Sequence, residues 1–261
     1  MRAPEAALAV STGAGVDGDV VVASALARRY GEGDTAVDAL RGVSLQVGRG
    51  RLVAVMGPSG SGKSTLMHVL AGLDKPTSGT VTIAGEEITG MNDNQLTQLR
   101  REHIGFVFQF YNLLPMLTAE ENVKLPLAVA GEKVDDAWFA ELMKKVGLSE
   151  RLGHRPSELS GGQQQRVAVA RSLVSRPTVV FADEPTGNLD SRSSDEILKL
   201  LRDSVDSYGQ TIVMVTHDPR AAAIADRILY IADGRIVLDQ QGATAAEVLQ
   251  TMNELEVAAA S

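Results

Sequence analysis

The chain has 261 residues, of which 44% are hydrophobic, with no cysteine and a formal net charge of −8 at pH 7. This composition predicts a globular protein with a substantial core, and it argues against a disulfide framework, a thiolate zinc site and a general nucleic-acid binder. No apolar run approaches the roughly 18 residues that cross a bilayer, and the N-terminus lacks the pattern of a signal peptide, so we expect a cytosolic protein.

The first part of the chain predicts a tail followed by a small antiparallel layer. Residues 1–18 are rich in Ala, Gly and small polar residues without periodicity, which is typical of a mobile tail. Apolar patterns predict strands over residues 20–29 and 37–47, joined across residues 31–34. A further strand at residues 80–84 continues this layer.

A phosphate-binding loop follows the apolar strand predicted at residues 52–56. The pattern G-x-x-x-x-G-K-[ST] is filled by Gly57, Pro58, Ser59, Gly60, Ser61, Gly62, Lys63, Ser64 and Thr65. A helix is predicted next, with Leu66, Val69, Leu70 and Leu73 on one face. The backbone N–H groups of such a loop surround the α and β phosphates of a nucleotide at the start of this helix. We expect Lys63 to reach the β and γ phosphates and the Ser64 hydroxyl to ligate Mg²⁺.

The remaining elements alternate between strands and helices. After a strand at residues 104–108 the pattern becomes helical, which predicts a helical subdomain over about residues 110–175. Apolar strands at residues 178–182 and 211–216, separated by a helix, indicate parallel βαβ units. Asp233-Gly234 predicts a hairpin between residues 227–232 and 235–240. A last helix carries Val248, Met252 and Leu255 on one side, which could cover the domain or a partner.

Two carboxylates end the strand at residues 178–182. The carboxyl end of a strand is where α/β folds bind ligands, so we expect Asp183 to hold Mg²⁺, directly or through water. Glu184 could orient or polarise the water that attacks the γ-phosphate. The alternative is that Asp183 and Glu184 belong to a solvated acidic loop after the strand and have no role in binding.

A second anion-binding helix start is predicted around Leu159. Ser160, Gly161, Gly162 and Gln163 precede a helical run, so their backbone groups could receive phosphate. Taken alone, this stretch is also typical of an ordinary helix cap, and spacing does not decide between the two.

This Leu-Ser-Gly-Gly-Gln stretch resembles the signature sequence of ATP-binding cassette (ABC) ATPases, and the resemblance covers about residues 20–240. It implies an α/β P-loop NTPase core with a parallel sheet, an antiparallel β subdomain and an inserted α-helical subdomain. Residues 19–240 would then form a single nucleotide-binding domain, and residues 241–261 a C-terminal helix and tail. In the family, two cassettes pair head to tail, and each signature contacts the γ-phosphate of ATP held by the other. The resemblance therefore implies a dimer with a copy of the chain or with a relative.

Four further positions match the family's motifs. Tyr30 matches the aromatic residue that stacks on adenine, although a strand tyrosine often packs instead. Gln109 matches the glutamine that touches Mg²⁺ and the attacking water. Asp190 matches the aspartate that links the two active sites, and it could also be a helix N-cap. His217 matches the histidine that contacts the γ-phosphate, whereas a lone histidine is usually structural.

The amino-acid sequence at residues 106–115, 118–123, 125–127 and 183–190 resembles that of the macrolide-exporter and lipoprotein-release branch of the ABC family (MacB/LolD-like). Members of this branch work with a permease that has few membrane helices and a large extracytoplasmic domain. Because no membrane segment follows in this sequence, we expect the permease to be a separate subunit that docks near residues 109–117, although this apolar stretch could also serve core packing. The chain would then be peripheral on the inner face of the cell membrane.

Other functions stay open at this point. A relative resembling the cell-division pair FtsE/FtsX would use the same engine to control extracytoplasmic enzymes. A soluble ABC ATPase of DNA repair or translation is disfavoured, because the chain has one cassette and neither a coiled-coil nor a cysteine-ligated zinc insertion. A small-molecule kinase would not need the signature. The substrate stays open as well: the ATPase could drive transport of a drug, a peptide or a lipoprotein, or it could transmit a mechanical signal alone.

Overall fold

The computed structural model describes residues 18–259 and is built around a six-stranded sheet with the strand order β10-β9-β3-β8-β7-β6. Neighbouring strands are parallel except for β9 and β10, which form an antiparallel hairpin at one edge. The bounds are β3 (Leu52–Met56), β6 (Ile104–Val107), β7 (Val179–Asp183), β8 (Thr211–Val215), β9 (Arg227–Ala232) and β10 (Arg235–Gln241). The parallel βαβ prediction is therefore confirmed.

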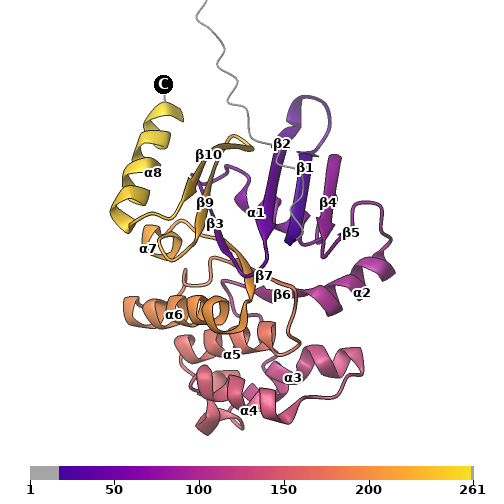
Figure 1. The fold of residues 1–261 in the computed structure, drawn as a ribbon, viewed down its shortest axis with the longest axis vertical. Coiled ribbons are helices and arrows are strands. Elements are labelled where there is room, and N and C mark those ends of the chain that lie inside the picture. Colours follow the sequence, from indigo (N-terminus) through magenta and orange to yellow (C-terminus); the bar gives the residue numbers. More distant parts are fainter. Residues whose placement is uncertain (1–17, 260–261) are drawn as a thin grey trace, which may run out of the picture.

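A second, antiparallel sheet has the order β2-β1-β4-β5 and lies beside α1 in Figure 1. Its strands are β1 (Asp19–Tyr30), β2 (Val37–Gly48), β4 (Ser78–Ile83) and β5 (Glu86–Glu87). This is the small antiparallel layer that the sequence predicts.

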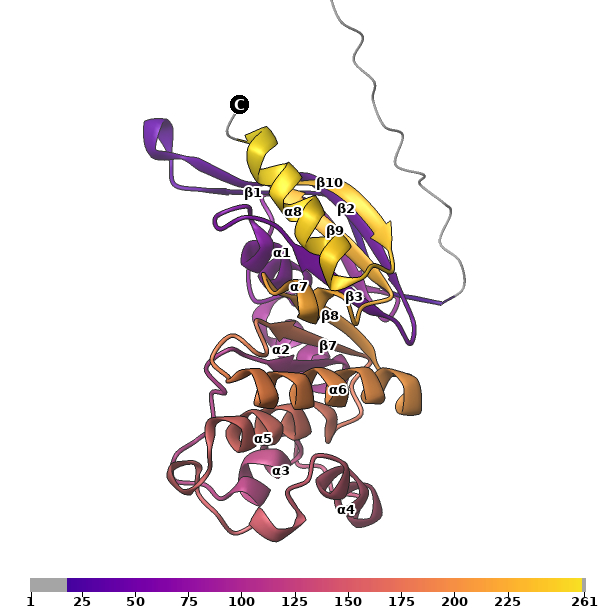
Figure 2. The ribbon, with the colours of Figure 1, turned by 90° about the vertical axis from the view of Figure 1, so that its left-hand side faces the viewer.

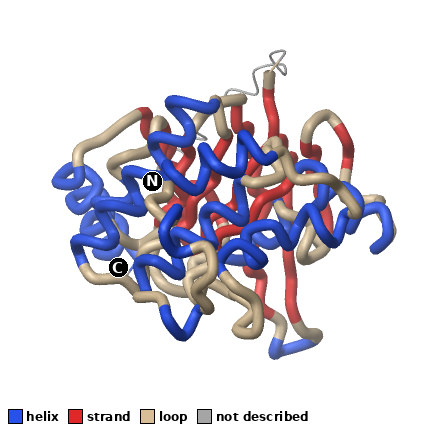
Figure 3. The backbone as a smooth tube through the Cα atoms, turned by 90° about the horizontal axis from the view of Figure 1, so that it is seen from below, coloured by secondary structure: helices blue, strands red, loops and turns tan. Residues whose placement is uncertain are grey.

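Helices cover the large sheet and extend from one end of it as a helical subdomain (Figures 1 and 3). The bounds are α1 (Lys63–Leu70), α2 (Asp93–His103), α3 (Ala119–Ala130), α4 (Asp136–Lys145), α5 (Gly161–Leu173), α6 (Ser191–Tyr208), α7 (Pro219–Ala222) and α8 (Ala245–Ala259). Short 3-10 turns occur at Gly33–Thr35, Ser149–Arg151 and Pro156–Glu158. The predicted α/β fold with a helical insert is confirmed.

Strand β3 divides the core into two clusters because both of its faces are buried. Leu52, Ala54 and Met56 belong to the cluster shared with the helical subdomain, α6, α7 and α8. Val53 and Val55 belong to the cluster shared with α1 and the small sheet. Burial on both faces explains why this strand is apolar throughout.

The hairpin between β9 and β10 turns through two residues with positive φ. Asp233 has φ +45° and Gly234 has φ +72°. A two-residue turn of this kind matches the right-handed twist of the flanking strands, and it requires residues that tolerate a left-handed backbone. The hairpin prediction from Asp233-Gly234 is confirmed.

One local expectation was wrong, and two helices lie where no individual helix was predicted. Helix α1 ends at Leu70, so Leu73 lies beyond it and is exposed rather than part of its buried face. Helix α2 was not predicted, because it buries only Leu96 and Leu99 and is otherwise polar. Helix α3 contains Pro126 in its interior, a residue that normally argues against a helix.

Both ends of the chain extend past the described region. The tail predicted for residues 1–18 lies, except for Gly18, outside the described residues, as do residues 260–261. Within residues 18–259, no helix is long and apolar enough to cross a membrane.

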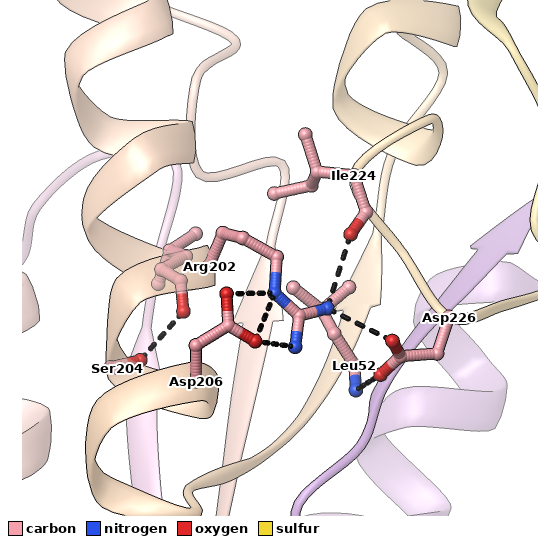
Figure 4. A network of polar contacts seen from close by, with 7 residues as sticks. Leu52, Arg202, Ser204, Asp206, Ile224 and Asp226 are labelled. Atoms are coloured by element: carbon pink, nitrogen blue, oxygen red, sulfur yellow. Dashed lines mark hydrogen bonds and ion pairs between the residues drawn. The ribbon is translucent and has the colours of Figure 1, made fainter.

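A polar network ties α6 to the start of β3 (Figure 4). Arg202 Nη1 donates to Asp226 Oδ1 at 3.1 Å and to the carbonyl oxygen of Ile224 at 3.3 Å. Asp226 Oδ2 accepts from the backbone N–H of Leu52 at 2.8 Å. The Asp226 carboxylate therefore holds the strand that leads into the phosphate loop against the helix that follows the signature region.

We expect Asp226→Ala to lower the free energy of unfolding by about 2 kcal/mol, since it removes an acceptor for one charged and one backbone donor, both partly shielded from water. Chemical denaturation measures this. Arg192→Ala is the matched control, because the Arg192 side chain is 90% exposed and its ion pair should contribute little. Equal stability of the two variants would contradict the role given to Asp226.

Candidate functional site

The phosphate loop packs closely against two neighbouring strands, which explains why glycine occupies positions 57 and 62. A Cβ atom on Gly57 would lie 2.0 Å from the carbonyl oxygen of Ile231 in β9. A Cβ atom on Gly62 would lie 2.4 Å from the carbonyl oxygen of Ala39 in β2. Both glycines also have a positive φ. Any larger residue at these positions would displace the loop from its strands.

Backbone hydrogen bonds fix the loop to the β9–β10 turn. The N–H of Gly234 donates to the carbonyl oxygen of Ser61 at 3.0 Å, and the N–H of Arg41 donates to that of Gly234 at 2.8 Å. The loop, the turn and β2 therefore form one unit. Loop position is set by contacts between segments that are far apart in the sequence.

Lys63 lies at the centre of the loop. Its Nζ donates to the carbonyl oxygens of Gly57 at 2.8 Å and Pro58 at 2.7 Å. Burial lowers the pKa of Lys63, whereas Glu184 and Asp183 act in the opposite direction. The cation is thus held next to the loop backbone and the two carboxylates.

Asp183 ends strand β7 and is largely withdrawn from water. Burial raises its pKa, and neighbouring Glu184 adds to this, whereas His68 and Lys63 oppose it. Its Oδ1 is buried and has no hydrogen-bond partner among the described residues. A buried carboxylate oxygen without a partner is costly, which marks it as a ligand position.

Glu184 has a strained backbone, with φ +46°. Its N–H donates to the carbonyl oxygen of Val215 at 2.9 Å, which fixes the residue between β7 and β8. Left-handed backbone is unfavourable for glutamate and occurs often at functional sites. His217 Nδ1 donates to Glu184 Oε1 at 2.8 Å. The Glu184 side chain is only 17% exposed, whereas that of His217 is 71% exposed, so the histidine faces solvent and the carboxylate is largely covered.

Two cavities meet at Lys63. One, of about 500 Å³, is lined by Lys63, Glu184 and His217, by Gly57, Pro58 and Ser59, and by residues of α7 and α8. The other, of about 380 Å³, is lined by Gly60, Gly62, Ser64 and Thr65 together with β2 and the β9–β10 turn. The structure therefore brings the predicted loop, Glu184 and His217 to one place.

The predicted signature begins α5. Ser160 is its N-cap, with Oγ accepting from the N–H of Gln163 at 3.3 Å, and Gln163 Oε1 accepts from the N–H of Ser160 at 2.9 Å. None of residues 160–163 is among the described residues that line the two cavities at Lys63. Within the described part of the chain, the signature therefore lies outside both cavities at Lys63.

Asp190 and Gln109 lie near the signature helix. Asp190 is the N-cap of α6, with Oδ1 accepting from the N–H of Ser193 at 3.0 Å and Oδ2 accepting from Ser193 Oγ at 2.7 Å. Gly162 faces this serine so closely that a Cβ atom would lie 2.8 Å from Ser193 Oγ. The carbonyl oxygen of Gln109 accepts from Asn188 Nδ2 at 3.0 Å, which holds this residue against the loop after β7.

Tyr30 is 40% exposed at the end of β1. Its hydroxyl donates to Asp74 Oδ2 at 2.6 Å, and the guanidinium of Arg28 lies 4.4 Å from its ring centre. The cation stacks on one face of the ring. The adenine-stacking role therefore stays a prediction.

Gln165 was not predicted as a site residue. It is fully buried in α5, and its Nε2 donates to the carbonyl oxygens of Pro185 at 2.6 Å and Phe108 at 3.3 Å. It thus joins the signature helix to the segments that carry Glu184 and Gln109. The sequence signal that could have identified it is an amide side chain at helical spacing from the mostly apolar residues that form the buried face of this helix.

A family model described as "ABC transporter" matches residues 40–187, which is more than half of the chain. The chain belongs to the ABC transporter family. This ABC ATPase is 49% identical over 216 residues to the lipoprotein-releasing system ATP-binding protein LolD of Geobacter metallireducens. The aligned region covers 82% of this chain and 96% of that protein. The chain is equally similar over 216 residues to the macrolide export ATP-binding/permease protein MacB of Marinobacter nauticus, but spans only 33% of that protein's length.

Solved structures agree with this placement. A dimeric structure of the ATP-binding cassette MJ0796 bound to ADP and Pi superposes with a TM-score of 0.77 at 41% identity, over 85% of this chain and 98% of that one. The structure of cbiO1 from Clostridium perfringens gives the same TM-score at 30% identity, over 90% of this chain and 92% of that one. The ABC ATPase fold and ATP binding are therefore shown.

We expect Asp183→Asn to stabilise the nucleotide-free ABC ATPase. Since burial raises the pKa of Asp183 above its ordinary value of 3.8, the folded chain retains this proton to higher pH than the unfolded chain, and stability falls as the pH rises through that interval. The side-chain amide of the Asp183→Asn variant is neutral at every pH, so folding does not bury a charge at this position. Its melting temperature should exceed that of the parent at about pH 7, and the difference should shrink towards about pH 4. A lower melting temperature at neutral pH would contradict this account.

Proposed function

We propose that this chain is the ATP-hydrolysing subunit of a transporter of the macrolide-export and lipoprotein-release type, working as a dimer that drives a separate membrane permease. One observation carries the proposal. Glu184, His217 and Lys63 share a cavity, whereas Ser160–Gln163 lie at the start of another helix outside it. A signature that serves ATP must therefore serve the ATP of a second subunit.

Glu184 is the group proposed to activate water. Its largely covered carboxylate lines the same cavity as Lys63, whose ammonium would attract the γ-phosphate. His217 is bonded to Glu184 and reaches the same cavity, so it can hold the carboxylate in place while contacting phosphate. Catalysis of phosphoryl transfer depends mainly on such positioning and charge.

Mg²⁺ is the metal that the residues fit. Among the described residues, no three His, Asp or Glu side chains gather as a complete metal site. Mg²⁺ is often held by one or two carboxylates together with substrate phosphates, and the unpartnered Asp183 Oδ1 provides such a ligand. Ser64 and Gln109 would complete the protein ligands. When bound, Mg²⁺ neutralises charge on the β and γ phosphates.

The dimer would form head to tail around two ATP molecules. Ser160–Gln163 of each subunit would then contact the γ-phosphate held by the other, at a helix start that favours negative charge. Asp190 would link the two sites, since it orders Ser193 against signature residue Gly162. ATP drives closure because only the closed dimer makes these contacts.

Permease docking is proposed for the segment after Gln109. Phe110 is 73% exposed and Met116 is 69% exposed, an unusual concentration of large apolar surface in nine residues of loop. A groove lined by Arg100, Arg101, Phe106 and Phe108 lies nearby. This surface would place the chain at the inner face of the cell membrane, held there by its permease.

Glu184→Gln is expected to keep ATP affinity, to lower the hydrolysis rate by about 10²-fold or more, and to accumulate an ATP-bound dimer. Equilibrium ATP binding, phosphate release and sedimentation measure the three effects. Lys63→Ala is the contrasting variant and should lose ATP affinity. Rapid hydrolysis by the Glu184→Gln variant would contradict the role given to Glu184.

The permease is tested by capture from membranes. Tagged Glu184→Gln protein with ATP and Mg²⁺ should retain an integral membrane protein with few membrane helices and a large extracytoplasmic domain. Adding Phe110→Asp and Met116→Asp should release this protein without dissociating the ATP-bound dimer. A dimer that captures no membrane protein would contradict the transporter function and favour a soluble ATPase.

A further inference from the structure

Helix α8 forms one wall of the cavity that contains the catalytic carboxylate. Leu249, Met252, Asn253 and Glu256 of α8 line the same space of about 500 Å³ as Lys63 and Glu184. This helix lies outside residues 40–187, where the family model matches. The sequence alone left open whether α8 covers the domain or a partner.

The inner side of α8 is fixed to the domain. Val248 is fully buried and Met252 is 9% exposed, and both belong to the core cluster shared with α7 and Tyr230. A capping box starts the helix: Glu247 Oε2 accepts from the N–H of Thr244 at 2.7 Å, and Thr244 Oγ1 accepts from the N–H of Glu247 at 3.3 Å. Helix α8 is therefore a built wall of the cavity, and its inner side already covers the domain.

The outer side of α8 faces the cavity opening. Leu249, Asn253 and Glu256 follow one another at helical spacing of four and three residues, so they share a face. All three are exposed, and Leu249 is 52% exposed. An apolar side chain thus stands at the rim of the cavity, next to the residues that handle the γ-phosphate.

We infer that this face of α8 is part of the dimer interface and that its occupant is the segment around Ser160–Gln163 of a second copy of this chain. The inference rests on the proposed function, in which the second copy's signature reaches the γ-phosphate. The space in front of Glu184 is bounded by α8, so a segment entering there meets Leu249 and Asn253. The proposed interface therefore continues from the phosphate loop onto α8.

The position of α8 argues against the permease as the occupant. Figures 1 and 2 place α8 beside β9, β10 and α7, at the opposite end of the molecule from α3 and α4 of the helical subdomain. The exposed residues proposed for permease docking, Phe110 and Met116, lie in the segment that leads into α3. The two surfaces are thus separate and can be tested separately.

The test uses Glu184→Gln protein as the parent and adds Leu249→Glu. A glutamate buried in this contact would lose hydration without a partner, so we expect the ATP-dependent dimer to weaken at least about tenfold in sedimentation equilibrium. Binding of a fluorescent ATP analogue is measured for each variant, and dimerisation is compared at nucleotide concentrations that saturate all of them. The melting temperature should stay unchanged. Val237→Glu on β10 is the matched control, since Val237 is 45% exposed and does not line this cavity.

The outcomes separate this inference from the proposed function. A weaker dimer for Leu249→Glu alone supports the α8 interface. Equal dimerisation of all three proteins overturns the α8 interface but leaves the proposed function intact, and tighter dimerisation of Leu249→Glu would instead make α8 an obstruction. If the Glu184→Gln parent itself forms no dimer with ATP, both the α8 interface and the proposed function are contradicted. Should Leu249→Glu unfold, Asn253→Arg provides the same test, because a bulky exposed side chain there would block entry.

Discussion

The site depends on the backbone contact between the phosphate loop and its two neighbouring strands. A Cβ atom on Gly57 would clash with the carbonyl oxygen of Ile231 in β9, and one on Gly62 would clash with that of Ala39 in β2. The large and the small sheet therefore meet at the loop. Because β3 enters the loop and β9 and β2 hold it, a shift of either sheet would move the N–H groups that bind phosphate.

The second constraint is the separation of functions within one chain. Lys63, Glu184 and His217 surround one cavity, but the signature begins α5, next to the start of α6, and does not line that cavity. Buried Gln165 connects the two through the carbonyls of Pro185 and Phe108. These two hydrogen bonds give a change at the carboxylates a short path to the signature helix and, in the proposed dimer, to the second subunit.

Much of the fold was predictable because its signals are local. The apolar strand before the phosphate loop, Asp233-Gly234 and the caps at Ser160 and Asp190 each act within a few residues, and each forms as predicted. The role of Glu184 was predicted from its place at the end of an apolar strand, and that of His217 came from the family resemblance. The structure adds their mutual hydrogen bond.

The features that could not be predicted from the sequence depend on contacts between distant segments. The bond between Tyr30 and Asp74, the place of Gln165 under the carboxylate loop and the α8 wall of the cavity all join residues far apart in the chain. Helix α2 lacks a strong apolar face, and Leu73 fits the helical period although α1 stops before it. Periodicity shows which side chains favour burial, but not which partner buries them.

The central claim is that the signature of one subunit completes the ATP site of another, and mixing two inactive variants tests it most directly. Lys63→Ala keeps an intact signature, and Ser160→Arg keeps an intact phosphate loop. Each alone should hydrolyse no ATP, whereas a mixture should regain part of the activity, since mixed dimers contain one complete site. If Ser160→Arg alone retained full activity, or if mixing restored none, the signature would not act across a dimer.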